Sequence, residues 1–156
     1  MRVFLTDELI GLEKELWDVG QIPKDSRWFQ EPREGDAGYD IRCLHTVIVR
    51  GRATCKIHTG VFLEIPTGYV GVMKGRSSLE SSGLVVAAGV IDSSYRGEVL
   101  VVVRNTEKTE RSLFSGDKVA QLLILPCHTP VLEYENELSS LSSSNRGKGG
   151  FGSTGR

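Results

Sequence analysis

Past residue 40, short apolar runs alternate with polar turn residues along most of the chain. The runs are dense in β-branched residues, and segments such as Pro66-Thr67-Gly68 and Ser115-Gly116-Asp117 separate them, as turns separate strands. The expected strands are His45–Arg50, Ala53–Ile57, Val61–Ile65, Tyr69–Lys74, Gly97–Arg104, Lys118–Leu125 and Pro130–Glu135. Many short strands at this spacing are typical of a β-sandwich or a β-barrel, so we expect an all-β fold.

One segment near the N-terminus follows a helical period instead. Its apolar residues recur at steps of three and four positions: Leu9, Leu12, Leu16 and Val19. This pattern predicts a short amphipathic helix over Asp7–Val19, with Thr6 or Asp7 as the N-cap and Gly20 as the stop. The apolar stripe favours packing against the rest of the protein, and a face that docks a partner protein is the alternative.

The C-terminal segment from Ser139 onward is polar and rich in glycine and serine, a composition that does not build a core. We therefore expect a single β-domain over residues 1–138 and a flexible tail over residues 139–156. The glycines let backbone N–H groups approach an anion closely. The tail adds hydroxyl, guanidinium and aromatic groups: Ser153, Thr154, Arg146 and Phe151. A solvated terminus without a function is the alternative.

A length of 156 residues suits one domain with a substantial core, and a formal net charge of −1 gives no sign of nucleic-acid binding. The cysteines Cys43, Cys55 and Cys127 are odd in number and widely spaced, so we expect three buried thiols rather than a disulfide framework. We expect no secretory signal, and no apolar run approaches the roughly 20 residues that span a bilayer. These features predict a cytoplasmic or otherwise intracellular protein.

Five short motifs occur in order along the chain. They are Asp36-Ala37-Gly38-Tyr39-Asp40, Gly75-Arg76-Ser77-Ser78-Leu79, the run from Ala88 to Glu98, Gly116-Asp117-Lys118-Val119-Ala120-Gln121-Leu122, and the tail from Arg146 to Arg156. Together they resemble, residue by residue, the motifs of the trimeric dUTPases. One such motif is a weak signal, but five in the same order are specific. The resemblance implies a compact β-barrel of jelly-roll type with the helix as an insertion, and hydrolysis of dUTP to dUMP and pyrophosphate.

The resemblance assigns the nucleoside half of the substrate to the third motif and its surroundings. Asp92 resembles the carboxylate that activates a water for attack on the α-phosphorus and receives the deoxyribose 3′-OH. Tyr95 resembles the aromatic residue packed under the sugar, where a ribose 2′-OH would have no room. Gly83–Ile91 would form a β-hairpin whose backbone pairs with uracil. Other side chains expected at the nucleoside are Val86, Val90, Ile91 and Leu100.

The resemblance assigns the phosphates to the second and fourth motifs. Arg76, Ser77 and Ser78 resemble the phosphate-binding segment, and Gln121 resembles the side chain that contacts the α-phosphate. Asp40 resembles the acid that faces metal-bound waters. A triphosphate requires charge neutralisation, so we expect Mg²⁺ that is held by the phosphates without a direct protein ligand.

The resemblance also implies a homotrimer whose active sites are shared between subunits. The tail of one subunit would close over dUTP bound between two others and exclude water from the reaction. The tail residues expected at the substrate are Arg146, Phe151, Gly152, Ser153 and Thr154. In this arrangement the aromatic ring of Phe151 would stack on uracil.

Two positions depart from the usual pattern of the family. Gly75 stands where proline is frequent, and Glu80 adds a charge beside the phosphate segment where a small residue is common. Gly75-Arg76-Ser77-Ser78 also resembles a motif of the dCTP deaminases, which makes a deaminase-related enzyme the nearest alternative. That reaction needs a strand glutamate, and Val102 occupies the aligned position here. A dUTPase with an added regulatory, protein-binding role is the second alternative.

Overall fold

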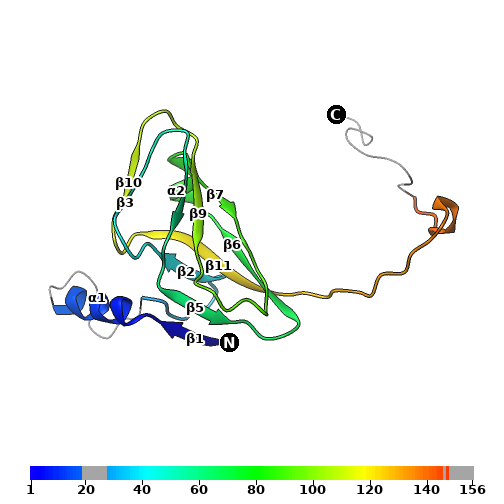
Figure 1. The fold of residues 1–156 in the computed structure, drawn as a ribbon, viewed down its shortest axis with the longest axis horizontal. Helices are drawn as coiled ribbons and strands as arrows, with labels where there is room; N and C mark the ends of the chain where they lie inside the picture. The colour runs from blue at the N-terminus through cyan, green and yellow to red at the C-terminus, as the bar shows by residue number, and fades with distance from the viewer. Residues whose placement is uncertain (19–27, 146, 148–156) are drawn as a thin grey trace.

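The structure, a computed structural model, describes residues 1–18, 28–145 and 147, and short strands dominate these ranges (Figure 1). The strands are β1 (Arg2–Leu5), β2 (Tyr39–Arg42), β3 (Val47–Val49), β4 (Thr54–Ile57), β5 (Val61–Glu64), β6 (Tyr69–Lys74), β7 (Leu84–Ala88), β8 (Val90–Ile91), β9 (Val101–Asn105), β10 (Arg111–Leu113) and β11 (Lys118–Pro126). The helices are α1 (Asp7–Asp18), α2 (Ser77–Ser81) and the 3₁₀ turn η1 (Leu138–Ser140). The expected all-β fold is confirmed, and none of the helices described is long and apolar enough to cross a membrane.

The strands pair in antiparallel fashion in two main sheets and two smaller ribbons. The largest sheet has the order β2-β11-β6-β8, the second has the order β4-β9-β7, and the ribbons are β1-β5 and β10-β3. The four strands of the largest sheet carry or directly precede the first four motifs. β11 lies between β2 and β6, so Gln121 pairs with Asp40 on one side and with Lys74 on the other. Motifs that are far apart in the sequence therefore meet in this sheet.

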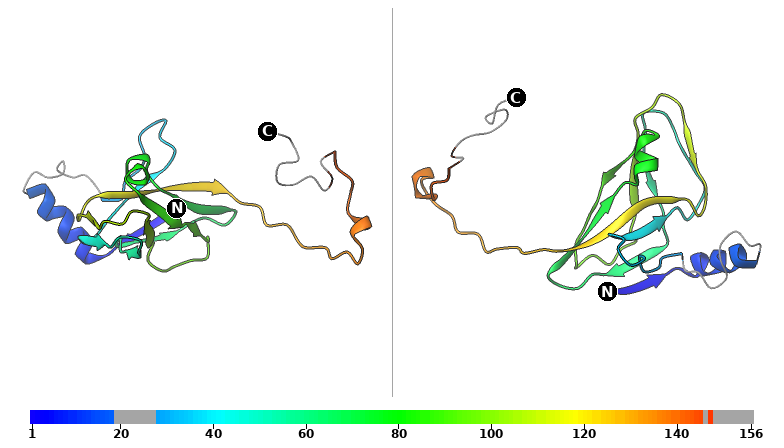
Figure 2. Two further views of the ribbon diagram at one scale, coloured as in Figure 1. Left: turned by 90° about the horizontal axis from the view of Figure 1, so that it is seen from above. Right: turned by 180° about the vertical axis from the view of Figure 1, so that it is seen from behind.

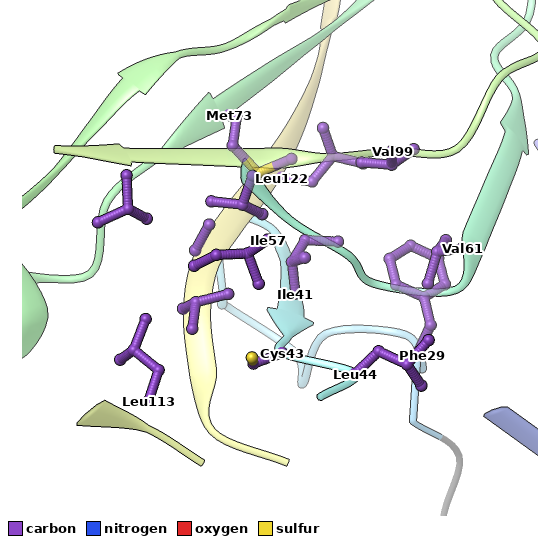
Figure 3. Close-up of a cluster of buried hydrophobic side chains, with 14 of the residues drawn as sticks. Phe29, Ile41, Cys43, Leu44, Ile57, Val61, Met73, Val99, Leu113 and Leu122 are labelled. Carbon is purple, nitrogen blue, oxygen red and sulfur yellow. The ribbon is translucent and has the colours of Figure 1, made fainter. Parts of the chain in front are cut away.

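The core fills the space between the sheets, where the inward-facing residues of the strands meet (Figure 3). On β9, Val101 and Val103 are fully buried whereas Arg104 is exposed, which is the alternation of a strand with one buried face. Ile41 of β2 and Leu122 of β11 are also fully buried. Burial of each such side chain stabilises the fold by about 1.5–3 kcal/mol.

Helix α1 packs on the β-domain through one face, as its apolar stripe predicts. Leu9 is fully buried and Leu12 is half-buried. The helix begins after Thr6, whose hydroxyl accepts the backbone N–H of Leu9 at 3.3 Å, so Thr6 is the N-cap. The buried carboxylate of Glu13 accepts the backbone N–H of Trp28. The other predicted positions of this helix, Val19, Gly20 and the side chain of Leu16, lie outside the described part of the structure.

Six of the seven expected strands are confirmed, with ends that differ from the expected ones by up to four residues. The seventh expectation is wrong, because Pro130–Glu135 forms no strand. No other strand of the described chain lies beside this segment to accept its backbone hydrogen bonds. The sequence pattern does not predict β1, β2 and β10, each of which is only three or four residues long.

Gly83–Ile91 does not form the expected β-hairpin. β7 pairs with β9 whereas β8 pairs with β6, so these two consecutive strands belong to different sheets. The chain changes sheet at Gly89, whose carbonyl accepts the N–H of Met73 at 2.7 Å. A β-carbon at position 89 would collide with the Met73 carbonyl, so only glycine allows this close approach.

Beyond β11 the chain leaves the β-domain as an extended, exposed arm, residues 127–145, which projects away from the sheets in each view (Figure 2). Large apolar side chains of the arm remain uncovered, with Val131 at 92% exposure and Tyr134 at 88%. The predicted boundary at residue 138 lies within this arm.

The three cysteines differ in exposure, which corrects the expectation of three buried thiols. Cys43 is buried, Cys55 is half-buried on β4, and Cys127 is exposed at the start of the arm, where no core lies beside it. Burial, reinforced by the negative charge of Asp117, raises the pKa of the Cys43 thiol to about 11.

Candidate active site

A small cavity of about 170 Å³ lies beside β8 and is named here the β8 cavity. The predicted nucleoside residues that line it are Val90, Ile91, Asp92, Tyr95 and Leu100. Val90 is 75% exposed and Tyr95 is 43% exposed, so part of the cavity wall faces open space. The structure thus brings five of the predicted residues to one place.

A tight turn after β8 sets the positions of Asp92 and Tyr95. The Asp92 carbonyl accepts the N–H of Tyr95 at 3.0 Å, which closes the turn. The Tyr95 hydroxyl donates to the Glu98 carbonyl at 2.9 Å, and the ring lies across Gly97, where any β-carbon would collide with it. The guanidinium of Arg96 donates to two carbonyls of the same turn at 2.7 and 2.8 Å. The backbone of the turn therefore holds the tyrosine ring in place.

Glu98 also lines the β8 cavity, and its carboxylate contacts the loop between β4 and β5. It accepts the backbone N–H groups of Thr59 and Gly60 at 2.9 and 2.8 Å, and it lies 2.8 Å from Nδ1 of His58. Burial alone would raise the pKa of Glu98, but the hydrogen bonds from Gly60, His58 and Thr59 outweigh it and hold this pKa below its usual range. The carboxylate therefore remains charged at neutral pH.

A larger cavity of about 580 Å³ lies beside α2 and is named here the α2 cavity. The predicted residues that line it are Asp40, Arg76, Ser77 and Gln121. Arg76 precedes α2 and Ser77 begins it, whereas the pairing of β2 with β11 brings Gln121 beside Asp40. The Gln121 amide donates to the Gly38 carbonyl at 3.3 Å, which fixes its orientation.

Cationic side chains surround the carboxylate of Asp40 in the α2 cavity. Its Oδ2 lies 2.6 Å from Lys118 Nζ, and its Oδ1 lies 3.5 Å from Arg76 Nε. Arg42 also lines the cavity and donates to a backbone carbonyl at 2.8 Å. Burial lowers the pKa of Arg42 and the charge of Arg76 lowers it further, although Asp40 and Asp117 oppose both effects. An anion bound beside these cations would relieve their mutual repulsion.

The α2 cavity fits a metal ion that arrives with phosphates better than one held by the protein. Among the described residues, no group of three or more His, Cys, Asp and Glu side chains is placed to hold a metal ion. The cavity instead offers Arg76 and Lys118 for phosphate oxygens and Asp40 for a metal-bound water. This donor set suits Mg²⁺, which keeps several waters when it binds a nucleotide.

Some predicted residues do not reach either cavity. Val86 is half-buried on β7 and packs against the core, and Ser78 is exposed on α2 but lines neither cavity. The β8 and α2 cavities share no lining residue within the part of the chain that the structure describes. The predicted tail residues outside the described ranges are Arg146, Phe151, Gly152, Ser153 and Thr154.

The sequence reasoning misses several charged residues that the structure places in the cavities, among them Lys118, Arg42 and Glu98. Lys118 belongs to the fourth motif and Arg42 follows the first motif by two residues, so their proximity to phosphate motifs is a usable signal. Glu98 ends the third motif, but its side-chain partners lie 38 to 40 residues earlier in the chain. Only the folded structure reveals those contacts.

The two departures from the usual motif pattern are neighbours in space. The Glu80 side chain lies across Gly75 so closely that a β-carbon at position 75 would collide with its carboxylate. Gly75 lines the α2 cavity, and Glu80 is exposed at the far end of α2. A proline at position 75 would force Glu80 to move, so the two departures are physically linked.

Comparison with known proteins decides the family. The sequence model of the dUTPase family matches residues 24–155. The deoxyuridine 5′-triphosphate nucleotidohydrolase of Tropheryma whipplei (strain Twist) is 40% identical over 132 residues, which are 81% of this chain and 88% of that protein. The chain belongs to the dUTPase family.

Solved dUTPase structures share the fold. The structure of the Staphylococcus bacteriophage 80alpha dUTPase with dUPNHPP gives a TM-score of 0.79 at 28% identity and covers 99% of this chain and 98% of that one. A mutant dUTPase from phage phi11 of S. aureus gives a TM-score of 0.67 at 29% identity and covers 74% of this chain and 94% of that one. That phi11 structure concerns the coordination of a structural Mg(II) ion.

As a dUTPase, the protein hydrolyses dUTP to dUMP. Mg²⁺ is the usual cofactor of this family, and the residues of the α2 cavity fit an ion carried by the substrate's phosphates. The family match and the named relatives do not favour the alternative of a dCTP deaminase. The docking of a partner protein on α1 stays a prediction.

Proposed function

We propose that this dUTPase catalyses the attack of water on the α-phosphorus of dUTP in active sites assembled from neighbouring subunits of a homotrimer. One observation carries the proposal. Five of the residues expected at the nucleoside line the β8 cavity, whereas Arg76, Ser77 and Gln121 of those expected at the phosphates line the α2 cavity, and no described residue lines both. One dUTP molecule needs both sets, so the β8 cavity of one subunit would face the α2 cavity of another.

At the β8 cavity, Asp92 activates the attacking water. Asp92 is exposed and follows directly after β8, so a water has access to its carboxylate. As the bond between the water oxygen and the α-phosphorus forms, the proton passes from the water to Asp92. The bond from the α-phosphorus to the bridging oxygen then breaks, and pyrophosphate leaves. Tyr95 packs under the deoxyribose and leaves no room for a 2′-OH.

At the α2 cavity, cations and neutral donors stabilise the charge that develops on the phosphates. Arg76, just before α2, and Lys118 and Gln121 of β11 converge on this cavity. Phosphate oxygens compete with Asp40 for Arg76 and Lys118, and this competition frees the carboxylate to accept hydrogen bonds from metal-bound water. Mg²⁺, when bound with the triphosphate, supplies charge neutralisation in addition to these side chains.

The arm supports assembly into an oligomer. Val131 is 92% exposed, Leu132 is 70% exposed and Tyr134 is 88% exposed, although burial of such a side chain is worth about 1.5–3 kcal/mol. Apolar side chains grouped on an exposed segment mark a surface for protein contact. We therefore expect the arm to pack against a neighbouring subunit, which would cover these side chains.

The proposed role of Asp92 is tested by Asp92→Asn. The amide keeps the size of the side chain and one oxygen acceptor, so substrate binding should survive. The negative charge that takes up the proton is lost, and kcat should fall by about 10²–10⁴-fold. The two measurements are pyrophosphate release from dUTP and binding of a non-hydrolysable dUTP analogue with Mg²⁺ present.

Asp18→Asn is the matched control, because Asp18 is exposed on α1 and lines neither cavity. It removes the same charge and should keep the original rate. A dUTP turnover near the original rate in Asp92→Asn would mean that another group activates the water. Loss of analogue binding in that variant would assign Asp92 to binding instead of proton transfer.

A further inference from the structure

The Asp92–Glu98 turn is attached to a loop that is distant in sequence. Glu98 Oε1 accepts the N–H groups of both Thr59 and Gly60, and Glu98 Oε2 faces His58 Nδ1 at 2.8 Å. The Glu98 side chain is only 21% exposed, so water competes weakly for these bonds. One carboxylate thus fixes the end of the turn to the loop between β4 and β5.

The same residue also holds the aromatic ring of the turn. The Glu98 carbonyl accepts the Tyr95 hydroxyl at 2.9 Å, and the ring lies across Gly97. The position of the ring therefore depends on where the backbone at Glu98 lies, and the carboxylate of Glu98 fixes that backbone. The Glu98 carboxylate is thus linked, through the backbone of its own residue, to the position of the Tyr95 ring in the β8 cavity.

The loop that receives Glu98 is itself held by hydrogen bonds. Thr59 is fully buried, and its hydroxyl donates to the Val99 carbonyl at 2.6 Å. Gly60 has a φ of +70°, and its carbonyl accepts the N–H of Thr6 at 3.1 Å. The Val99 N–H in turn donates to the Val61 carbonyl at 2.8 Å. The loop is thus bonded to Val99 and to Thr6, the N-cap of α1.

We propose that Glu98 is a positioning residue for sugar specificity, which holds Tyr95 at the height that admits deoxyribose and excludes ribose. The inference rests on the proposed function, in which Tyr95 packs under the sugar. Steric exclusion of a ribose 2′-OH requires the Tyr95 ring to stay in place, because a shift of the ring by a fraction of an ångström would admit the larger substrate. Glu98 holds the ring in place through its three bonds to the β4–β5 loop.

The test compares dUTP with UTP as substrates of Glu98→Ala and Glu98→Gln. Alanine removes all three contacts, whereas the glutamine oxygen can still accept the N–H groups of Thr59 and Gly60. We expect the ratio of kcat/KM for dUTP to kcat/KM for UTP to fall by about tenfold in Glu98→Ala, the low end for loss of one steric contact. Glu98→Gln should retain most of the discrimination.

Asn105→Ala is the matched structural control. Asn105 also makes three hydrogen bonds that hold a turn: its amide donates to the carbonyls of Val49 and Thr109 at 3.0 and 2.8 Å, and its oxygen accepts the N–H of Glu107 at 2.9 Å. It lines neither cavity. Its replacement should lower the melting temperature and leave the dUTP to UTP ratio unchanged, measured well below the melting temperature of each variant.

The outcomes separate the inference from the proposed function. An unchanged ratio in Glu98→Ala together with a lowered ratio in Tyr95→Ala would overturn the positioning role and keep Tyr95 at the sugar. An unchanged ratio in both variants would remove Tyr95 from sugar recognition and so contradict that part of the proposed function. An equal loss of discrimination in Asn105→Ala would show that general destabilisation causes the effect, which would also overturn the inference.

Discussion

Replacement of Leu9 by alanine measures how firmly α1 belongs to the folded domain. Leu9 is fully buried, and it packs so close to Gly60 that an added β-carbon there would lie 3.2 Å from Leu9 Cβ. A buried Leu→Ala change costs about 2–5 kcal/mol, because transfer free energy is lost and a cavity remains. An isolated helix of 12 residues is marginal in water, so α1 depends on this anchor. Since fraying of the helix can relieve part of the cavity, we expect the lower half of that range.

The assay is chemical denaturation at one fixed protein concentration, because the stability of an oligomer depends on concentration. Ile10→Ala is the control: Ile10 is 47% exposed on the same helix, and its change should stay within about 0.5 kcal/mol. Leu9 lines neither cavity, so the rate on dUTP should be nearly unchanged. Unchanged stability in Leu9→Ala would refute self-packing of α1 and favour an exposed docking face for a partner protein.

Three further predictions concern the tail, acid stability and thiol reactivity. Deletion of Arg146–Arg156 should leave the protein folded and lower pyrophosphate release by orders of magnitude, and original turnover would remove the tail from the mechanism. The pKa of Glu98 is lowered, so the stabilising effect of its charge is complete at neutral pH and is lost as the pH falls below the usual Glu value of about 4.3. Below that pH the unfolding free energy of Glu98→Gln should therefore fall less steeply with pH than that of the original protein. Equal slopes in the two proteins would contradict this prediction. At pH 8 an alkylating reagent should modify exposed Cys127 but spare buried Cys43, whose pKa is raised to about 11, as peptide mass spectrometry can show.

The alternation of apolar and polar residues predicts those strands whose side chains face two different environments. β9 is such a case, since Val101 and Val103 face the core whereas Arg104 faces water. The same pattern predicts Pro130–Glu135 wrongly, because alternation shows what a segment could form and not which strand lies beside it. The two-residue strand β8 is too short to carry a period, and it follows Gly89, which is as compatible with a hairpin turn as with a change of sheet.

The motifs predict which residues form the candidate site better than they predict how these residues are placed. Residue types in sequence order indicate Asp40, Asp92 and Gln121, and the structure places all three on cavity walls. The division into two cavities is not visible in the sequence, because it depends on which sheet each strand joins. The bonds of Glu98 are equally hidden in the sequence, since its carboxylate accepts backbone N–H groups, which every residue type except proline can donate, so no motif marks the partners.

The charge of Glu80 weakens the attraction of the α2 cavity for phosphates without reversing it. In bulk water the interaction energy of two unit charges 4 Å apart is only about 1 kcal/mol. Glu80 is exposed, so water and salt screen the charge of its carboxylate. Arg76 and Lys118 are about two-thirds buried and sit within the cavity wall, where screening is weaker. The carboxylate also rests against Gly75 instead of entering the cavity lining. Because position 75 is a glycine, the Glu80 carboxylate has room beside the edge of the cavity and is not itself a lining residue, which is consistent with an acid being tolerated in that segment.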